Sequence, residues 1–340
     1  MKISLVLPTN RTSYSAIARV LEVASLDPNK FELIVRDNSG DERKQAFLSS
    51  IESPTLRLFN VPNRGAFENF VEALRLSTGD FVLLFGDDDW ISTLGLEQLH
   101  SRALSINGDS KFALVTGDCL VESSGGSGLV RYTTLDSESP EQRLTGYLTT
   151  SAPNVLYYSA VRRALIQRCY AFLESLPYKL SFHDQLVSLI YLIAGRVATI
   201  ERVVYFYNLG IWETADGTLA KDRACYRDAG LPIEVDRIHW LICGMEGAFL
   251  LKSNLMSEFP YDRGRMVDLW FSTYFMRFKH LGRESGYSDT PANAATQRLR
   301  DKWMGAGEAN LNELLLDICD IIELVDKPGA ERYFNYWSTL

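Results

Sequence analysis

Three consecutive carboxylates, Asp87, Asp88 and Asp89, are the side chains of this sequence best suited to chemistry. They follow an apolar run, residues 81–84, that is typical of a strand buried on both faces. Carboxylates this close together repel one another unless a cation or strong hydrogen-bond donors lie among them. Hard oxygen ligands at a strand's carboxyl end suit Mg²⁺ or Mn²⁺ carrying a phosphorylated substrate. The structural alternative is an ordinary acidic turn, because Gly and Asp favour turns.

Strands and helices alternate before this acidic cluster. Apolar runs typical of strands cover residues 3–7, 31–35 and 56–61, the first ending at Pro8. Helical spacing of apolar residues covers 14–26, 42–51 and 66–76. Alternation at this spacing indicates βαβ units and a mainly parallel sheet, so we predict an α/β fold.

A polar turn follows each of these strands, at residues 8–11, 36–41, 62–65 and 86–90. Ligands bind outside the carboxyl ends of strands in such sheets, so the four turns are expected to converge on one site. No Gly-x-Gly-x-x-Gly follows the first strand and no Gly-Lys-Ser/Thr loop occurs in the chain. A Rossmann dehydrogenase and a P-loop NTPase are therefore disfavoured.

Composition limits the class of protein further. The chain has 340 residues, 46% of them hydrophobic, enough for one large or two modest domains. A net charge of −8 argues against nucleic-acid binding. The five cysteines are scattered without metal-ligand spacing, which indicates reduced thiols. No apolar run approaches the roughly 18 residues of a membrane span, and residues 3–7 are too short for a signal peptide. We expect a cytoplasmic protein whose membrane contact, if any, is peripheral.

Four motifs in their order and spacing resemble the family 2 glycosyltransferases of the GT-A fold. They are Leu5-Val6-Leu7-Pro8-Thr9-Asn10, the segment Phe31 to Ser39, Asn63-Arg64-Gly65, and Gly79-Asp80-Phe81 with the acidic triplet. The resemblance covers roughly residues 1–210. It implies a Rossmann-like sheet of GT-A type and an inverting transferase that uses a nucleotide-diphosphate sugar with Mn²⁺ or Mg²⁺.

The resemblance also assigns the donor site. The residues implied in nucleotide-sugar binding are Pro8, Thr9, Asn10, Arg11, Asp37, Asn38, Asn63, Arg64, Asp87 and Asp88. Asp37 matches the aspartate that pairs with the base, and a carboxylate acceptor suits the N–H of uracil or thymine. Asp89 is the implied metal ligand together with Asp87, while Asp88 lies nearer the ribose. Asp37 in an Asx-turn and Arg64 as a solvated turn residue are the structural alternatives.

A further carboxylate, Asp184, stands at the start of a helix in Ser181-Phe182-His183-Asp184. The family places Glu-Asp here, so the resemblance implies that Asp184 is the general base, taking the proton of the acceptor hydroxyl. His183 replaces the Glu, and its role stays open. A capping box from Ser181 to Asp184 is the alternative explanation.

The resemblance implies that the region between the acidic cluster and Asp184 faces the acceptor. Residues 112–118 and 154–159 are predicted strands, 122–132 a mobile loop or hairpin tip, 133–147 a lid, and 160–173 a helix. With His183, the candidate acceptor contacts are Asn154 and Tyr158. Strand packing is the alternative role of Tyr158.

The C-terminal third is predicted to be all helical. Apolar residues at helical spacing cover 236–254, 266–280, 290–304 and 308–325. We predict a transferase domain over 1–214, with a nucleotide-sugar half of about 1–110 and an acceptor half of about 111–214, and a helical domain over 215–340. The aromatic stripe in 266–280 is interpreted as core. A homo-oligomer face or a peripheral membrane surface meeting a lipid-linked acceptor is the alternative.

Together these features predict a glycosyltransferase moving a sugar from a UDP- or dTDP-sugar to a glycan or lipid-linked saccharide, as in cell-surface polysaccharide or O-antigen biosynthesis, at the inner face of the membrane. One alternative is a nucleotidyltransferase that makes sugar nucleotides. Such enzymes carry a Gly-rich loop after the first strand, and residues 9–12 lack its glycines. The other is a non-catalytic glycan-binding protein, against which the intact carboxylate cluster argues.

Overall fold

The computed structural model describes residues 1–12, 14–61, 65–132, 134–150, 154–180, 182–280 and 289–340. The chain divides into two compact units, and each is described here by itself. The first comprises Met1–Ala171 and Ala194–Gly210, and the second Phe172–Ile193 and Ile211–Leu340. The chain passes from the first unit to the second for the last time after Gly210, near the predicted boundary at residue 214. The segment Phe172–Ile193, predicted for the transferase domain, groups with the second unit.

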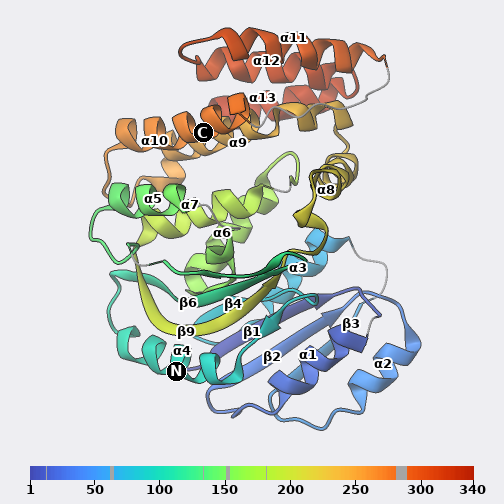
Figure 1. The fold of residues 1–340 in the computed structure, drawn as a ribbon, viewed down its shortest axis with the longest axis vertical. Helices are drawn as coiled ribbons and strands as arrows, with labels where there is room; N and C mark the ends of the chain where they lie inside the picture. The colour runs from blue at the N-terminus through green and yellow to red at the C-terminus, as the bar shows by residue number, and fades with distance from the viewer. Residues whose placement is uncertain (13, 62–64, 133, 151–153, 181, 281–288) are drawn as a thin grey trace. The chain divides into compact units, whose positions relative to one another are not determined.

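A nine-stranded sheet organises the first unit, in the order β3-β2-β1-β4-β8-β6-β9-β5 with β7 paired to β6 (Figure 1). The strands are β1 (Ile3–Thr9), β2 (Phe31–Asp37), β3 (Leu56–Asn60), β4 (Phe81–Leu84), β5 (Trp90–Ile91), β6 (Phe112–Ser123), β7 (Gly126–Val130), β8 (Ala160–Arg162) and β9 (Arg196–Asn208). Strands β1 to β4 pair in parallel, and β6 pairs in parallel with β9, whereas β5, β7 and β8 pair antiparallel. This is the GT-A type α/β fold that the sequence predicts.

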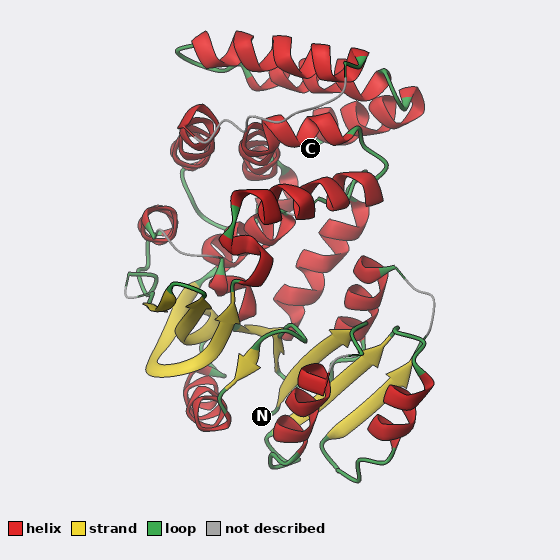
Figure 2. Cartoon of the chain, turned by 45° about the vertical axis from the view of Figure 1, so that its right-hand side comes forward, coloured by secondary structure: helices red, strands yellow, loops and turns green. Residues whose placement is uncertain are grey.

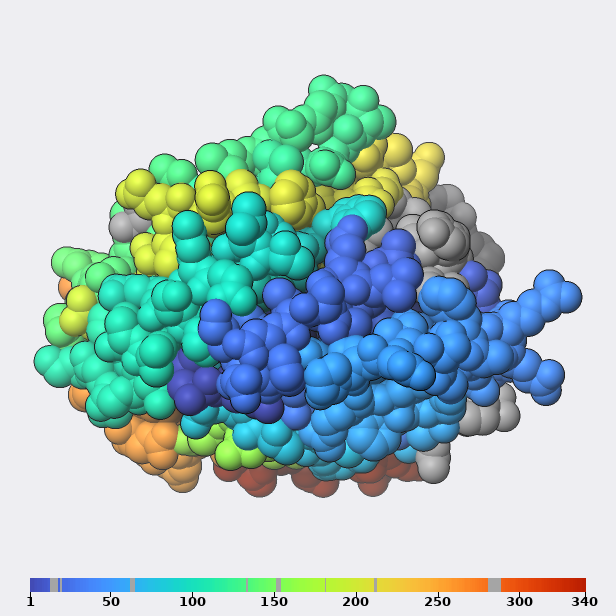
Figure 3. Space-filling view, turned by 90° about the horizontal axis from the view of Figure 1, so that it is seen from below, coloured from blue at the N-terminus to red at the C-terminus, as the bar shows by residue number. Residues whose placement is uncertain are grey.

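Helices connect the parallel strands. They are α1 (Tyr14–Ala24), α2 (Glu42–Ser49), α3 (Ala66–Arg75) and α4 (Thr93–Ile106). The strands β1, β2 and β4 are buried along almost their whole length, because helices cover the sheet that they form. The arrowheads of the neighbouring parallel strands end at one edge (Figure 2). Most of the face in Figure 3 belongs to this N-terminal part, coloured blue to cyan.

The first strand continues past the predicted stop at Pro8. Pro8 pairs with Arg36 of β2 in the parallel register, and the strand ends one residue later, at Thr9. Along a strand, the backbone N–H and C=O groups of successive residues point alternately to the two neighbouring strands. The carbonyl of Val6 points to β4, since it accepts from Phe85 N, and the nitrogen of Pro8, two residues later, lies on the same side. The β4 ladder has ended by Pro8, and no hydrogen bond is lost to proline there.

The prediction of a strand over residues 154–159 was wrong. Residues Val155–Tyr158 form a 3₁₀ turn, and strand β8 begins only at Ala160. A short run of apolar and aromatic residues carries no period that separates a strand from a buried turn. The predicted hairpin tip is the β6–β7 hairpin, and the middle helices are α5 (Pro140–Thr149) and α6 (Arg163–Ser175).

The second unit is helical. Its helices are α7 (His183–Ala194), α8 (Ala215–Asp228), α9 (His239–Lys252), α10 (Arg263–His280), α11 (Pro291–Gly305), α12 (Leu311–Glu323) and α13 (Lys327–Thr339). Trp270, Tyr274 and Phe278 of the aromatic stripe are almost completely buried, as expected of core residues. Among the described residues, no helix is both long and apolar enough to cross a membrane.

Close packing of α9 on α10 makes a stability prediction. A Cβ at Gly247 would overlap the indole of Trp270, which is fully buried and donates to Cys243 O at 3.1 Å. Gly247→Ala is therefore expected to lower the free energy of unfolding by about 1–3 kcal/mol, because overpacking forces a buried ring to shift. Gly305→Ala is the matched control in helix α11, since nothing lies within 4 Å of its Cβ. Equal stability of the two variants in thermal unfolding would contradict the prediction.

Candidate active site

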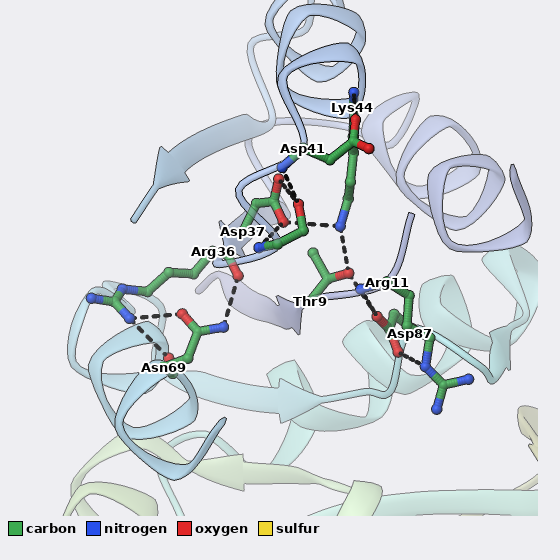
Figure 4. Close-up of polar contacts among 9 residues, drawn as sticks. Thr9, Arg11, Arg36, Asp37, Asp41, Lys44, Asn69 and Asp87 are labelled. Atoms are coloured by element: carbon green, nitrogen blue, oxygen red, sulfur yellow. Dashed lines mark hydrogen bonds and ion pairs between the residues drawn. The ribbon is translucent and has the colours of Figure 1, made fainter. Parts of the chain in front are cut away.

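The carboxyl ends of three parallel strands bring together polar residues distant in sequence. Thr9 is the last residue of β1 and pairs in register with Asp37, the last residue of β2. The acidic triplet begins two residues after Phe85, directly beyond β4. Figure 4 shows Thr9 between the Asp37 and Asp87 side chains. The predicted convergence of the turns after β1, β2 and β4 is present.

Arg11 neutralises two members of the triplet. Its Nε lies 3.0 Å from Asp87 Oδ1, and its Nη2 lies 2.7 Å from Asp88 Oδ2. Asp87 Oδ2 accepts a 2.6 Å hydrogen bond from the Thr9 hydroxyl. The side chains of Arg11 and Asp88 are 49% and 40% exposed, so this pairing is open to solvent and weak enough to exchange. The guanidinium of Arg11 thus already places a positive charge between these two carboxylates.

Asp89 is buried and anchored to strand β9. Its Oδ2 accepts from the Tyr205 hydroxyl at 2.7 Å, and its Oδ1 accepts from Asn208 N at 2.9 Å. Burial raises the pKa of Asp89 to about 6, although the hydrogen bonds from Asn208 and Tyr205 act in the opposite direction. Burial also raises the pKa of Tyr205 well above its ordinary value, so this hydroxyl remains a donor. Asp89 is thus held in one orientation.

The turn that carries the triplet depends on Gly86. A Cβ at this position would lie 2.8 Å from Asp88 Oδ1 and 2.9 Å from Asp89 Oδ2. A larger residue here would therefore force these carboxylates to shift from their positions against the turn. Gly86 N also donates to the Tyr205 hydroxyl at 3.1 Å, which ties the turn to the same tyrosine that holds Asp89.

Asp37 is completely buried, and several donors surround its carboxylate. Oδ1 accepts from Lys44 Nζ at 2.9 Å and from Ser39 N at 3.0 Å, while Oδ2 accepts from the Ser39 hydroxyl at 3.1 Å. The bond from Ser39 N closes an Asx-turn, the structural alternative that the sequence left open. Recognition of a base by Asp37 stays a prediction. It requires a base N–H to reach the remaining Oδ2 lone pair, because Lys44 and Ser39 already use the other positions.

The donor set fits a divalent metal. Asp87 and Asp89 supply hard carboxylate oxygens, the ligands that Mg²⁺ and Mn²⁺ prefer. Arg11 shows that the cluster attracts a cation. Within the described ranges, however, no three His, Cys, Asp or Glu side chains are arranged as a ready-made metal site. Water molecules, or the oxygens of a bound diphosphate, would therefore complete the coordination of Mn²⁺ or Mg²⁺ beyond these carboxylates.

Arg11 can be tested as an internal competitor for the metal. Arg11→Gln is expected to raise the Mn²⁺ affinity of the nucleotide-free protein about 2–5-fold, because an exposed ion pair worth ~0.5–1 kcal/mol no longer opposes binding. Mn²⁺ binding is measured by calorimetry, with Arg57→Gln as the control, since Arg57 pairs with Glu32 instead. An unchanged or weakened Mn²⁺ affinity in Arg11→Gln would count against the competition.

The other predicted donor and acceptor residues differ in what the structure says of them. Asn63 and Arg64 lie outside the described residues. Asn10 is exposed, and Asn38 donates its backbone N–H to Thr9 O at 3.0 Å. Tyr158 stacks on Tyr205 at a ring distance of 4.7 Å, which connects it to the tyrosine that holds Asp89. Pro8 is described above, and Asn154 is half-buried before the 3₁₀ turn.

Asp184 and His183 belong to the second unit, in the first turn of α7. Asp184 Oδ1 accepts from Gln185 N at 2.7 Å. The ring of His183 is buried, with Nδ1 accepting from Leu180 N at 3.1 Å and Nε2 lying 3.4 Å from Glu246 Oε2 of α9. His183 therefore attaches the start of α7 to the helical unit, and contact with an acceptor stays a prediction.

Sequence reasoning missed two residues of this site, Lys44 and Tyr205. Lys44 occupies the first turn of α2, where the helix dipole favours acidic side chains. A lysine at this position is therefore unusual, which is the signal that the sequence offered, and the structure shows that it is buried. Tyr205 lies in an apolar run, and a buried tyrosine hydroxyl needs a partner. That partner, Asp89, is 116 residues away and could not be read from local patterns.

Comparison with known proteins agrees with the fold. Residues 4–110 match the family model described as glycosyl transferase family 2. The search of curated proteins found no match. Among solved structures, residues 1–349 of S. aureus TarS match with a TM-score of 0.52 and 14% identity, over 99% of this chain and 89% of that one. The complex of the same TarS segment with UDP-GlcNAc matches with a TM-score of 0.53 and 14% identity, over 100% and 91%. The complex with UDP gives a TM-score of 0.51 and 15% identity, over 100% and 91%.

Proposed function

We propose that the protein is a family 2 glycosyltransferase that moves a sugar from a UDP- or dTDP-sugar to a glycan or lipid-linked saccharide with inversion at the anomeric carbon, and the match of residues 4–110 to the family model supports this proposal. The observation that carries the proposal is the meeting of Thr9, Asp37 and Asp87 at one sheet edge. Ligands of such sheets bind at this edge. The TarS complexes with UDP-GlcNAc and UDP support a uridine nucleotide as the first donor to test.

Asp89 and Asp87 hold the metal in this proposal, and Asp88 lies nearer the ribose. When bound, Mn²⁺ or Mg²⁺ supplies a positive charge that stabilises the departing diphosphate. The residues of the chain prepare for it: Tyr205 and Asn208 N fix Asp89, and the Thr9 hydroxyl fixes Asp87. Arg11 must give up its pairing with the carboxylates when a cation enters, and is then available for a phosphate oxygen.

Asp184 is the general base of the proposal. As the acceptor hydroxyl oxygen forms its bond to the anomeric carbon, its proton passes to the Asp184 carboxylate, and the bond from the anomeric carbon to the diphosphate oxygen breaks. Attack on the face opposite the leaving group gives inversion. The mechanism requires Asp184 to come within hydrogen-bond reach of the acceptor hydroxyl, about 2.6–3.2 Å.

A nucleotide-sugar panel tests the proposed function. UDP-, dTDP-, GDP- and CDP-sugars are mixed with the protein with and without Mn²⁺, and thermal unfolding is recorded, since a ligand that binds only the folded state raises its stability. We expect the largest shift with a UDP- or dTDP-sugar and Mn²⁺, followed by slow release of the free sugar. Formation of a sugar nucleotide from a sugar phosphate and a nucleoside triphosphate would favour the nucleotidyltransferase instead. Binding of a glycan without turnover of any donor would favour the non-catalytic alternative.

The wider setting remains part of the proposal. We place the enzyme in cell-surface polysaccharide or O-antigen type biosynthesis, at the inner face of the membrane, with the helical C-terminal region as the candidate surface for a lipid-linked acceptor or a second copy of the chain. The division of the chain into a transferase domain over residues 1–214 and a helical domain over residues 215–340 is likewise proposed.

A further inference from the structure

Lys44 is a buried cation beneath the candidate donor site. Its side chain is 2% exposed and lies in the first turn of α2, whose N-cap is Asp41. Burying an ammonium group is costly, and the positive end of the helix dipole opposes a cation at this position. Its ion pair with Asp37 compensates for part of this cost, but a buried ion pair is often no more stable than apolar residues of the same volume. Lys44 therefore suggests a role beyond holding α2.

The hydrogen bonds from Lys44 run in one direction. An ammonium group only donates, so Lys44 Nζ donates to Asp37 Oδ1 at 2.9 Å and to Thr9 Oγ1 at 2.9 Å. Because the Thr9 oxygen accepts from Lys44, its single proton is directed to Asp87 Oδ2, 2.6 Å away. Figure 4 shows this continuous path from Lys44 through Thr9 to Asp87.

We propose that Lys44 is a positioning residue for the metal site, acting through the Thr9 hydroxyl on Asp87. The path uses Asp87 Oδ2 for Thr9 and presents Oδ1, the atom now paired with Arg11 Nε at 3.0 Å, to an incoming cation. A carboxylate that is already oriented loses less freedom when it binds a metal. The inference rests on the metal assignment within the proposed function.

A purely structural role for Lys44 makes a different prediction. If the residue only joins α2 to β2 through Asp37, loss of the Thr9 hydroxyl leaves that ion pair in place and leaves metal affinity unchanged. If the path to Asp87 matters, Thr9→Val weakens the metal site even though Lys44 and Asp37 remain paired. Thr9→Ser restores a hydroxyl and should restore the affinity.

The experiment measures Mn²⁺ alone, without nucleotide, through the spin-resonance signal of the free ion. Thr9→Val is expected to weaken Mn²⁺ binding about 10–100-fold, the usual effect of losing an outer-shell partner. Thr9→Ser should stay within about 3-fold of the wild type. Thr55→Val is the matched control, because this buried threonine donates to Leu26 O at 2.7 Å, away from the carboxylates. Circular dichroism and thermal unfolding check that each variant is folded.

A second arm tests Lys44 itself. Lys44→Met is combined with Asp37→Asn so that no unpaired charge stays buried. This pair of changes should weaken Mn²⁺ binding as much as Thr9→Val, and adding Thr9→Val should weaken it no further, since one path is involved. A folded Thr9→Val protein with the Mn²⁺ affinity of Thr55→Val would overturn the inference, as would a wild type that binds no Mn²⁺. A wild type that binds Mn²⁺ but no nucleotide sugar would instead refute the proposed function alone.

Discussion

Asp184→Asn is expected to lower kcat for sugar transfer or donor hydrolysis by about 10²–10⁴-fold, the usual contribution of a general base. The amide has nearly the same size and hydrogen-bonding reach as the carboxylate but cannot take the proton of the attacking hydroxyl. Binding of the nucleotide sugar should be retained, because the proposed donor contacts include Asp37, Asp87 and Asp88 and not Asp184. The KM for the donor is therefore expected to change little while kcat falls.

The same variant separates catalysis from helix capping. In the alternative capping box, Ser181, which lies outside the described residues, is the cap, and the Asp184 side chain only accepts a backbone N–H. The amide oxygen of an asparagine can accept as well, so this role predicts that Asp184→Asn keeps both stability and activity. Asp184→Ala removes this acceptor altogether and is expected to cost a further ~1 kcal/mol of stability. Single-turnover rates, donor affinity from calorimetry and thermal unfolding of both variants give the three quantities needed. Full activity in Asp184→Asn would refute the base.

The parallel part of the sheet was predictable because its signals are local. Buried parallel strands give continuous apolar runs such as 81–84, and their turns carry the polar residues that meet at one edge. The relation of Thr9 to Asp87 followed from strand topology alone. The 3₁₀ turn at Val155–Tyr158 and the extension of β1 past Pro8 depended on neighbours that a short window does not contain.

The parts that could not be predicted depend on distant partners. The segment Phe172–Ile193 looks like any amphipathic helical stretch, and its grouping with the C-terminal helices follows from contacts such as Tyr274 OH to Gln185 Oε1 at 2.9 Å. Likewise, His183 lies against Glu246, 63 positions later in the chain. Local patterns specify which face of a helix is apolar but leave open which of several apolar surfaces it meets.

Asp89→Asn is expected to abolish most Mn²⁺-dependent activity, by at least about 10²-fold, because a neutral amide is a poor metal ligand and ~3 kcal/mol of charge stabilisation is lost. Tyr205 and Asn208 N can still contact the amide, so the fold should persist. Asp118→Asn is the matched control, since Asp118 is a buried carboxylate of the same sheet that pairs with Arg131. Retained Mn²⁺ activation in Asp89→Asn would refute the assignment.

The pKa of Asp89, raised by burial to about 6, adds a pH dependence to this prediction. Below that value the metal must displace a proton, so Mn²⁺ affinity should fall about tenfold per pH unit, and above it the affinity should level off.

In the metal-free protein, the contribution of Asp89 to the free energy of unfolding changes with pH in the opposite direction. The folded pKa exceeds the unfolded value, so the contribution of Asp89 is fully present below about pH 4 and is lost as the pH rises through about 6. Because Mn²⁺ binds the ionised form, the stabilisation that it adds should grow over the same interval. Both dependences should disappear in Asp89→Asn and remain in Asp118→Asn, which identifies the carboxylate that titrates as the one that holds the metal.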